Sequence, residues 1–125
     1  MNVKIDTKEK FTVITPPGPS ITANMTGELR ELLLANLQNP FPHLILNFKQ
    51  VEQMEPEVAN TLCEIQHLYY EKNYSFIVCE LRKNVEDQLD QLNILELMNT
   101  TPTESEAWDI VQMEEIEREL LNDDD

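Results

Sequence analysis

Four consecutive residues with binding potential, Met54 to Glu57 (MEPE), follow an apolar segment and precede a helical apolar pattern. Pro56 predicts that a helix begins here, because the first helical turn does not need the N–H that proline lacks. A helix start carries free N–H groups and a positive partial charge, so side chains there are natural contact or regulatory groups. Two carboxylates and a proline supply no nucleophile, metal cluster or glycine loop. These residues therefore predict a binding surface rather than a catalytic centre.

The remaining residues with possible chemistry carry no catalytic pattern. His43 and His67 are isolated, and the two cysteines form no CxxC pair, so we expect no metal site. Cys63 and Cys79 fall in apolar segments, which favours reduced, buried thiols over a disulfide. The sequence has no GxSxG elbow, P-loop or dinucleotide fingerprint, and no pair of its many carboxylates is marked as a general acid and base. We therefore expect no cofactor and no enzyme activity.

The charge of the chain limits its partners. The 125 residues include 24 acidic and 9 basic side chains, for a net charge of -15. This charge repels phosphate backbones and anionic membranes but suits a basic protein surface. No apolar run approaches the roughly 20 residues that span a bilayer, and the N-terminus lacks the apolar region of a signal peptide. The sequence predicts a single cytoplasmic domain that binds neither nucleic acid nor membranes.

Apolar periodicity predicts the elements that position the MEPE segment. Runs of β-branched and aromatic residues predict strands at residues 3–6, 11–15, 43–48, 74–79 and 94–98. Helical spacing predicts a first helix that begins near Thr22 or Asn24, both suitable N-cap residues, and ends at about residue 38. It predicts further helices at residues 56–73, 83–92 and 101–121. Repeated strand–helix–strand units imply parallel neighbours in one sheet, and the first two strands can pair antiparallel. The prediction is an α/β fold with a mixed sheet of four to five strands and about four helices.

The order and spacing of these segments, over residues 3–111, resemble the STAS domains, the family that includes bacterial anti-sigma-factor antagonists. Members of that family have an apolar strand followed by a loop with an Asp-Ser-Ser/Thr-Gly-like motif that opens a helix. Here LILNF at Leu44–Phe48 is similar to that strand, and FIVC at Phe76–Cys79 resembles the next one. The resemblance implies a STAS-like domain over residues 1–112, followed by an acidic helical extension and a frayed tail over residues 113–125.

The loop departs from the family pattern. Glu55 stands where the family usually has Asp, and Val58 replaces the usual Gly. The Ser or Thr that is phosphorylated in switching members matches Glu57, so the phosphorylation switch is not carried over. Glu57 could imitate a phosphoserine, with one charge against about -1.5 to -2 for a phosphate. Alternatively, it is an ordinary acid in a first helical turn, stabilising by about 0.3–1 kcal/mol.

The resemblance implies a protein partner, an anti-sigma factor or a switch kinase, that contacts two segments. One is the proline-rich turn after the second strand, for which a merely stiff loop is the alternative. The other is the helix start, where Thr61 is either a substitute phosphoacceptor or an ordinary helix threonine. The predicted partner-binding residues are Pro19, Ser20, Thr22, Met54, Glu55, Pro56, Glu57 and Thr61.

Two other functions stay open. A small-ligand-binding or enzymatic domain of similar build would need a deep pocket with convergent polar groups. A structural subunit would assemble through the C-terminal helix, where Met113, Ile116 and Leu120 extend beyond the usual end of the family. For Trp108 and the apolar stripe after it, we predict packing in the core, as a helical cap on the chain's own sheet. The alternative is that the extension with Met113, Ile116 and Leu120 docks a partner or a second copy.

Overall fold

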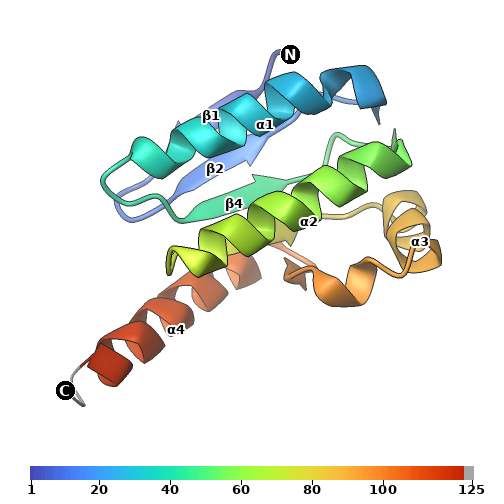
Figure 1. Cartoon of the computed structure of the whole chain (residues 1–125). Coiled ribbons are helices and arrows are strands. Elements are labelled where there is room, and N and C mark those ends of the chain that lie inside the picture. The colour runs from blue at the N-terminus through green and yellow to red at the C-terminus, as the bar shows by residue number, and fades with distance from the viewer. Residues whose placement is uncertain (123–125) are drawn as a thin grey trace.

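Strongly apolar segments form the centre of a mixed five-stranded sheet in the computed structural model, which describes residues 1–122 (Figure 1). In spatial order the strands are β1 (Lys4–Thr7), β2 (Thr12–Thr15), β4 (Leu44–Asn47), β6 (Phe76–Cys79) and β7 (Thr100–Thr101). β1 and β2 pair antiparallel, and the other neighbours in the sheet are parallel. Every residue of β2, β4 and β6 is buried, as expected for strands covered on both faces.

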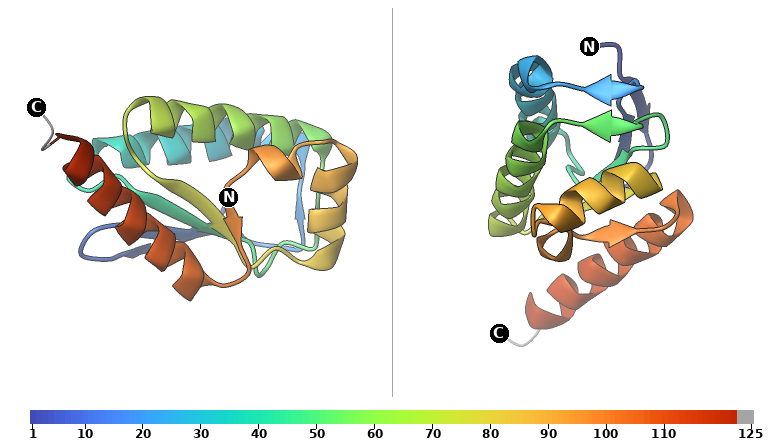
Figure 2. Two further views of the ribbon diagram at one scale, coloured as in Figure 1. Left: turned by 90° about the horizontal axis from the view of Figure 1, so that it is seen from below. Right: turned by 90° about the vertical axis from the view of Figure 1, so that its right-hand side faces the viewer.

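Four α-helices within residues 1–122 pack around this sheet. They are α1 (Thr26–Ala35), α2 (Pro56–Glu71), α3 (Lys83–Gln91) and α4 (Glu104–Asn122). α1 and α2 cover one face, whereas α4 crosses the opposite face (Figure 2). Short 3-10 helices, η1 (Ala23–Met25), η2 (Asn36–Gln38) and η3 (Leu95–Leu97), lie in the connections. None of the described helices has the length and apolar character needed to cross a membrane.

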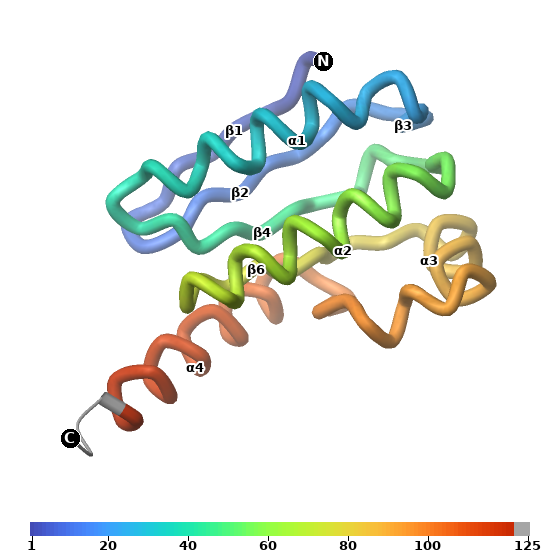
Figure 3. The backbone as a smooth tube through the Cα atoms, in the orientation of Figure 1, coloured from blue at the N-terminus to red at the C-terminus, as the bar shows by residue number. Residues whose placement is uncertain are grey.

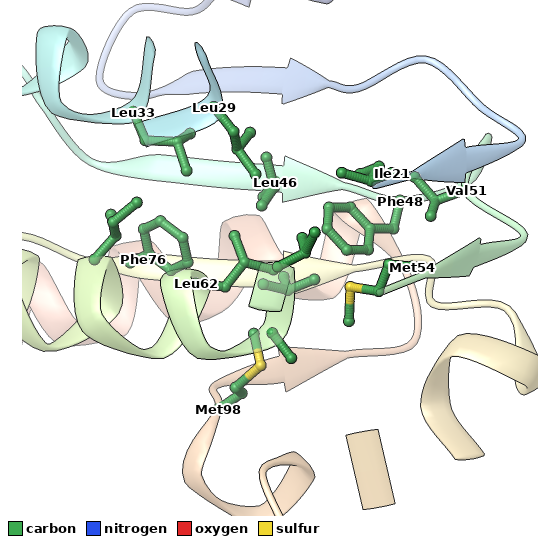
Figure 4. Packing of buried hydrophobic residues seen from close by; sticks show 14 of the residues in the cluster. Ile21, Leu29, Leu33, Leu46, Phe48, Val51, Met54, Leu62, Phe76 and Met98 are labelled. Carbon is green, nitrogen blue, oxygen red and sulfur yellow. The ribbon is translucent and has the colours of Figure 1, made fainter. Parts of the chain in front are cut away.

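The main core lies between the sheet and the α1–α2 layer. Leu46 and Phe48 from the central strand segment meet Leu29 of α1 and Leu62 of α2, all with no exposed surface (Figure 4). A smaller cluster lies under α4 and is formed by Phe11, Val13, Ile45, Ile77, Cys79, Ala107 and Val111. The two clusters bury the strands from both sides, which is the usual arrangement for parallel strands joined by helices.

A second, two-stranded sheet joins β3 (Ser20–Ile21) to β5 (Gln53–Met54) in parallel. β3 follows the carboxyl end of β2 and β5 follows that of β4, and these two strands are parallel neighbours. The chain therefore delivers both segments to the same end of the main sheet. β3 lies before α1, with only Thr22 and η1 between them, and the segment preceding α2 lies beside it (Figure 3).

The predicted α/β class with a mixed sheet and four helices is confirmed. The predicted strand at residues 94–98 is wrong, because residues 95–97 form η3 and the last strand is β7. Ile94 and Met98 are the buried residues of this segment, and their spacing of four positions is helical rather than alternating. β3 and β5, of two residues each, were not predicted.

The prediction that Trp108 and the stripe after it pack in the core is right for Val111, and α4 does cover the sheet, but it is wrong for Trp108, Met113, Ile116 and Leu120. Trp108 is 44% exposed, and Met113, Ile116 and Leu120 are more exposed still. α4 instead contacts the sheet through Ala107 and Val111, on its other apolar side. The helix runs through residue 112 without a break, so the division of the chain there stays a prediction. It includes Asn122, and the predicted fraying of residues 123–125 lies outside the described residues.

Candidate protein-binding site

The two segments predicted to contact a partner lie side by side. Their pairing is made by backbone hydrogen bonds across the β3–β5 sheet. The Glu52 N–H donates to the Pro19 carbonyl oxygen at 2.7 Å, and the Glu55 N–H donates to the Ile21 carbonyl oxygen at 3.0 Å. The proline-rich turn and the start of α2 thus form one continuous surface, although more than 30 residues separate them in sequence.

Glu55 also joins the two segments through its side chain. Its backbone occupies the N-cap position of α2, but its carboxylate makes no capping bond to that helix. Instead, Glu55 Oε1 accepts a 2.8 Å hydrogen bond from the backbone N–H of Ala23, the first residue of η1. The first helical segment was expected to have Thr22 or Asn24 as its cap. Thr22 is indeed the N-cap residue of η1, but its side chain makes no capping hydrogen bond. The Glu55 carboxylate accepts the hydrogen bond from the Ala23 N–H that a capping side chain would otherwise accept.

Helix α3 supports the same loop from the other side. Arg82 Nε donates to the Lys49 carbonyl oxygen at 2.9 Å, and Asn84 Nδ2 donates to the Glu52 carbonyl oxygen at 2.9 Å. Gln88 Oε1 accepts from the Met54 N–H at 3.2 Å. Sequence analysis missed these supporting residues, because a side chain that bonds a distant backbone leaves no periodic signal.

A close backbone approach locks the proline-rich turn against the loop before β5. A Cβ atom built on Gly18 would lie 1.6 Å from the Gln50 carbonyl oxygen. Real Cβ atoms do not come this close to a backbone oxygen, so this position accepts only glycine in the present arrangement.

The eight predicted contact residues differ in exposure. Pro19, Glu55, Pro56 and Glu57 are exposed, and Ser20 and Thr22 are half-buried. Met54 is 4% exposed and packs in the main core, so its side chain positions the loop and is not part of the exposed surface.

Thr61 is also buried, at 8% exposure, and its hydroxyl donates to the Glu57 carbonyl oxygen at 2.9 Å. Its geometry is that of an ordinary helix threonine bonded to the preceding turn. A kinase could reach this hydroxyl only after the first turn of α2 had opened.

The described residues hold no group of three or more His, Cys, Asp and Glu side chains placed to bind a metal ion. The thiols of Cys63 and Cys79 are free. Burial raises the pKa of Cys79 to about 12, with the Glu104 and Glu80 carboxylates adding to the effect, and burial also raises the pKa of Cys63. Both sulfurs therefore stay protonated at neutral pH and are poor nucleophiles.

The chain matches the family model described as the STAS domain over residues 2–107. The chain belongs to the STAS-domain family. The resemblance seen in the order of its strands and helices is thereby confirmed. No curated protein sequence matches this STAS domain.

Solved structures similar to this STAS domain include bacterial anti-sigma-factor antagonists. A candidate anti-sigma factor antagonist from Thermotoga maritima is 14% identical, with a TM-score of 0.78 over 88% of this chain and 94% of that protein. A serine-to-glutamate variant of RsbS from Moorella thermoacetica is 18% identical, with a TM-score of 0.74 over 90% of this chain and 96% of that protein.

SpoIIAA, an anti-sigma factor antagonist described as a Bacillus cell fate determinant, is matched in two states. The unphosphorylated form has 17% identity and a TM-score of 0.71, covering 89% of this chain and 96% of SpoIIAA. The phosphorylated form has 16% identity and a TM-score of 0.64, covering 88% of this chain and 99% of SpoIIAA. At such identities these matches show the fold that the STAS domain shares with them.

Replacement of Glu55 by Ala is expected to lower the free energy of unfolding of the STAS domain by about 1 kcal/mol, the usual effect of losing a helix cap. Glu55→Gln keeps an acceptor oxygen for the Ala23 N–H and should retain most of this stability. Urea denaturation followed by circular dichroism measures the difference, and amide exchange at Ala23 locates it. The matched control is Glu52→Ala, an exposed acid of the same loop. Equal stability of Glu55→Ala and Glu52→Ala would contradict the capping role.

Proposed function

We propose that this STAS domain is a non-catalytic protein-interaction module of the anti-sigma-factor-antagonist type. Its partner is an anti-sigma factor or a switch kinase, and its contact surface consists of Pro19, Ser20 and Thr22 together with Glu55–Glu57. The observation that carries the proposal is the joining of these two segments by β3–β5 pairing and by the Glu55–Ala23 hydrogen bond. Because β3, β5 and the start of α2 hold this surface in place, it is preorganised, and less conformational entropy is lost when a partner binds.

The surface at Glu55–Glu57 favours docking over chemistry. None of the eight predicted contact residues lines the groove of about 890 Å³ that lies against α4. The exposed groups at the helix start are two carboxylates and a proline ring. An exposed surface of this kind lacks the enclosure and convergent polar groups that a small substrate requires. We therefore favour a protein partner over the small-ligand or enzymatic alternative.

Glu57 gives the proposed surface a fixed negative charge. It lies in the first turn of α2, exposed to solvent, and the described residues form no ion pair with its carboxylate. SpoIIAA has been solved with and without phosphate, and RsbS has been solved with glutamate in place of a serine. By the family resemblance, position 57 corresponds to the phosphorylated residue. We propose that Glu57 holds this chain in one binding state that no kinase or phosphatase acting at this position can reverse.

Affinity capture from the cells that encode the chain tests the proposal. The wild-type protein should recover a partner with an anti-sigma-factor or ATPase-kinase fold, and titration calorimetry should then give its affinity. Glu57→Lys should weaken that affinity at least tenfold, about 1.4 kcal/mol, by reversing a charge inside the contact surface. The matched control is Glu31→Lys, which makes the same charge change on an exposed position of α1. Recovery of no partner, or an equal loss of partner affinity in Glu57→Lys and Glu31→Lys, would refute the proposed surface.

Glu57→Ser distinguishes two roles of the Glu57 carboxylate: a fixed charge that sets the binding state, or an ordinary acid that stabilises the start of a helix. If the charge sets the state, we expect the partner affinity to change at least about fivefold, or roughly 1 kcal/mol. Loss of a dipole interaction alone would instead lower the free energy of unfolding by about 0.3–1 kcal/mol and leave affinity unchanged. Calorimetry with the captured partner and urea denaturation of the free domain together distinguish the two outcomes.

A further inference from the structure

A groove of about 890 Å³ lies between α4 and the hairpin that joins β1 to β2. Residues 8–11 of the hairpin form one wall, α4 from Glu104 to Glu119 forms the other, and Phe41 and His43 close one side. The groove residues lie mostly on α4 and the hairpin. α4 crosses the face of the sheet opposite α1 and α2 (Figure 2). The groove is therefore separate from the proposed anti-sigma-type surface.

The groove exposes large apolar side chains. Phe41 is 53% exposed, Trp108 is 44% exposed and Ile116 is 56% exposed. The ring of Trp108 on α4 lies 6.3 Å, centroid to centroid, from that of Phe11 on the hairpin, so both walls of the groove contribute an aromatic ring. Leu120 continues the same side of α4 one turn beyond Ile116 and is 62% exposed. Large exposed apolar side chains gathered at one groove, on a chain that is otherwise strongly acidic, are typical of an interaction site.

The charged residues around the groove indicate which kind of partner it can bind. Residues 104–121 contain seven carboxylates and one arginine. Of the acids on the groove wall, Glu104 accepts from Asn47 Nδ2 at 2.9 Å and Glu115 pairs with His43, whereas Glu119 lies exposed on the rim. Lys8 and Lys10 lie on the hairpin side, and Lys8 pairs with Asp6. The α4 side of the groove thus presents apolar side chains together with three carboxylates, Glu104, Glu115 and Glu119, and no basic side chain.

This combination disfavours two occupants. A second copy of the chain would place its own acidic α4 against this one, and like charges facing each other oppose association. An anionic membrane would meet the same repulsion from a chain with a net charge of -15. A helix with an apolar face and basic flanks satisfies both the exposed apolar residues and the carboxylates.

We propose that the α4 groove docks a basic amphipathic helix of a partner protein. Its apolar face would cover Trp108, Phe41 and Ile116, and its lysines or arginines would pair with acids of α4 such as Glu119. The wall from Glu104 to Glu119 spans about 22 Å at the helical rise, which matches a helix of about 15 residues. This interaction is additional to the anti-sigma-type contact and does not depend on it.

The test uses a synthetic peptide of about 15 residues, with leucines at helical i, i+3 and i+4 spacing and lysines elsewhere. Trp108 is the only tryptophan of the chain and lines the groove, so its emission reports occupancy directly. We expect a blue shift of that emission, protection from iodide quenching, and saturable binding that weakens as salt is raised. A peptide of the same composition with scrambled leucine spacing should bind at least tenfold more weakly.

Ile116→Arg and Met113→Arg form the matched pair of variants. Both replace an exposed apolar side chain on α4 with the same charge, but only Ile116 lines the groove. Ile116→Arg should weaken peptide binding at least tenfold, and Met113→Arg should leave it within about twofold, since affinity at interfaces is concentrated in a few buried apolar contacts. Because both positions are exposed, both variants are expected to fold, which circular dichroism verifies.

Each of several outcomes would overturn the proposal. Unchanged Trp108 emission, equal binding of the scrambled peptide, or equal losses in the two variants would each show that the groove does not recognise an amphipathic helix. A concentration-dependent dimer lost in Ile116→Arg would assign the groove to a second copy instead. Binding to vesicles of phosphatidylglycerol, lost in the same variant, would assign it to a membrane surface.

Discussion

Gly18→Ala is expected to lower the free energy of unfolding by at least about 3 kcal/mol, the upper range for an added methyl that forces the backbone to move. The new Cβ would lie 1.6 Å from the Gln50 carbonyl oxygen. The atom in the way belongs to the backbone, so no rotamer change can relieve the contact. Relief requires the proline-rich turn to separate from the loop before β5. That movement would break the hydrogen bond from Glu52 to Pro19.

Gly27→Ala is the matched control, because these are the two glycines of the chain. A Cβ at Gly27 meets nothing within 4 Å, and the residue lies in the first turn of α1. This substitution should raise the free energy of unfolding by about 0.5–1 kcal/mol, because alanine restricts the unfolded chain and favours the helix. Urea denaturation followed by circular dichroism measures both variants. Similar stability of the two would show that the turn adjusts freely to a side chain at position 18.

Periodic apolar patterns in the sequence predicted most of the main sheet and the helices. Apolar runs such as LILNF and FIVC specify strands covered on both faces, and Pro56 marks the start of α2 correctly. These signals are local, so they can be read without knowing which segments meet. The family model then confirmed the STAS assignment that rested on their order.

The features that build the site were not predictable in the same way. β3 and β5 have two residues each, which is too short for any alternation to show. Their pairing arises because β2 and β4 end at the same edge of the sheet, a property of the assembled fold. The carboxylate of Glu55 reaches Ala23 across 32 positions, and the sequence offered Thr22 as the more usual capping side chain.

The sequence pattern also did not predict which side of α4 faces the sheet. The helix has two apolar sides, one with Trp108 and Ile116 and the other with Ala107 and Val111. The larger side chains gave the stronger hydrophobic signal, yet the smaller ones face the sheet. Small residues allow a helix to approach a sheet closely, whereas the large ones stay exposed and line the groove. An error in predicting burial thus located the second candidate surface.

Phe48→Ala is expected to lower the free energy of unfolding by about 3–5 kcal/mol, the usual range for truncating a buried phenylalanine. Phe48 directly follows β4 and has no exposed surface. Its side chain lies among Ile21, Val51 and Met54, and so supports the β3–β5 sheet from the core side (Figure 4). Its backbone N–H donates to the Cys79 carbonyl oxygen at 3.0 Å, which keeps the start of the loop attached to β6. The cavity would therefore open beneath the proposed partner-binding surface.

Phe41→Ala removes the same ring from an exposed position and is the matched control. We expect it to change the free energy of unfolding by less than about 1 kcal/mol, because Phe41 is half exposed and lies outside the core. Hydrogen exchange adds a local measurement, since the amides of Glu52 and Glu55 should lose protection in Phe48→Ala and keep it in Phe41→Ala. Binding of the basic peptide should show the opposite pattern. Phe48→Ala should bind the peptide as the wild type does, under conditions in which it is folded, whereas Phe41→Ala should bind it weakly. If both variants lost stability and peptide binding together, the two surfaces would be coupled through the sheet rather than independent.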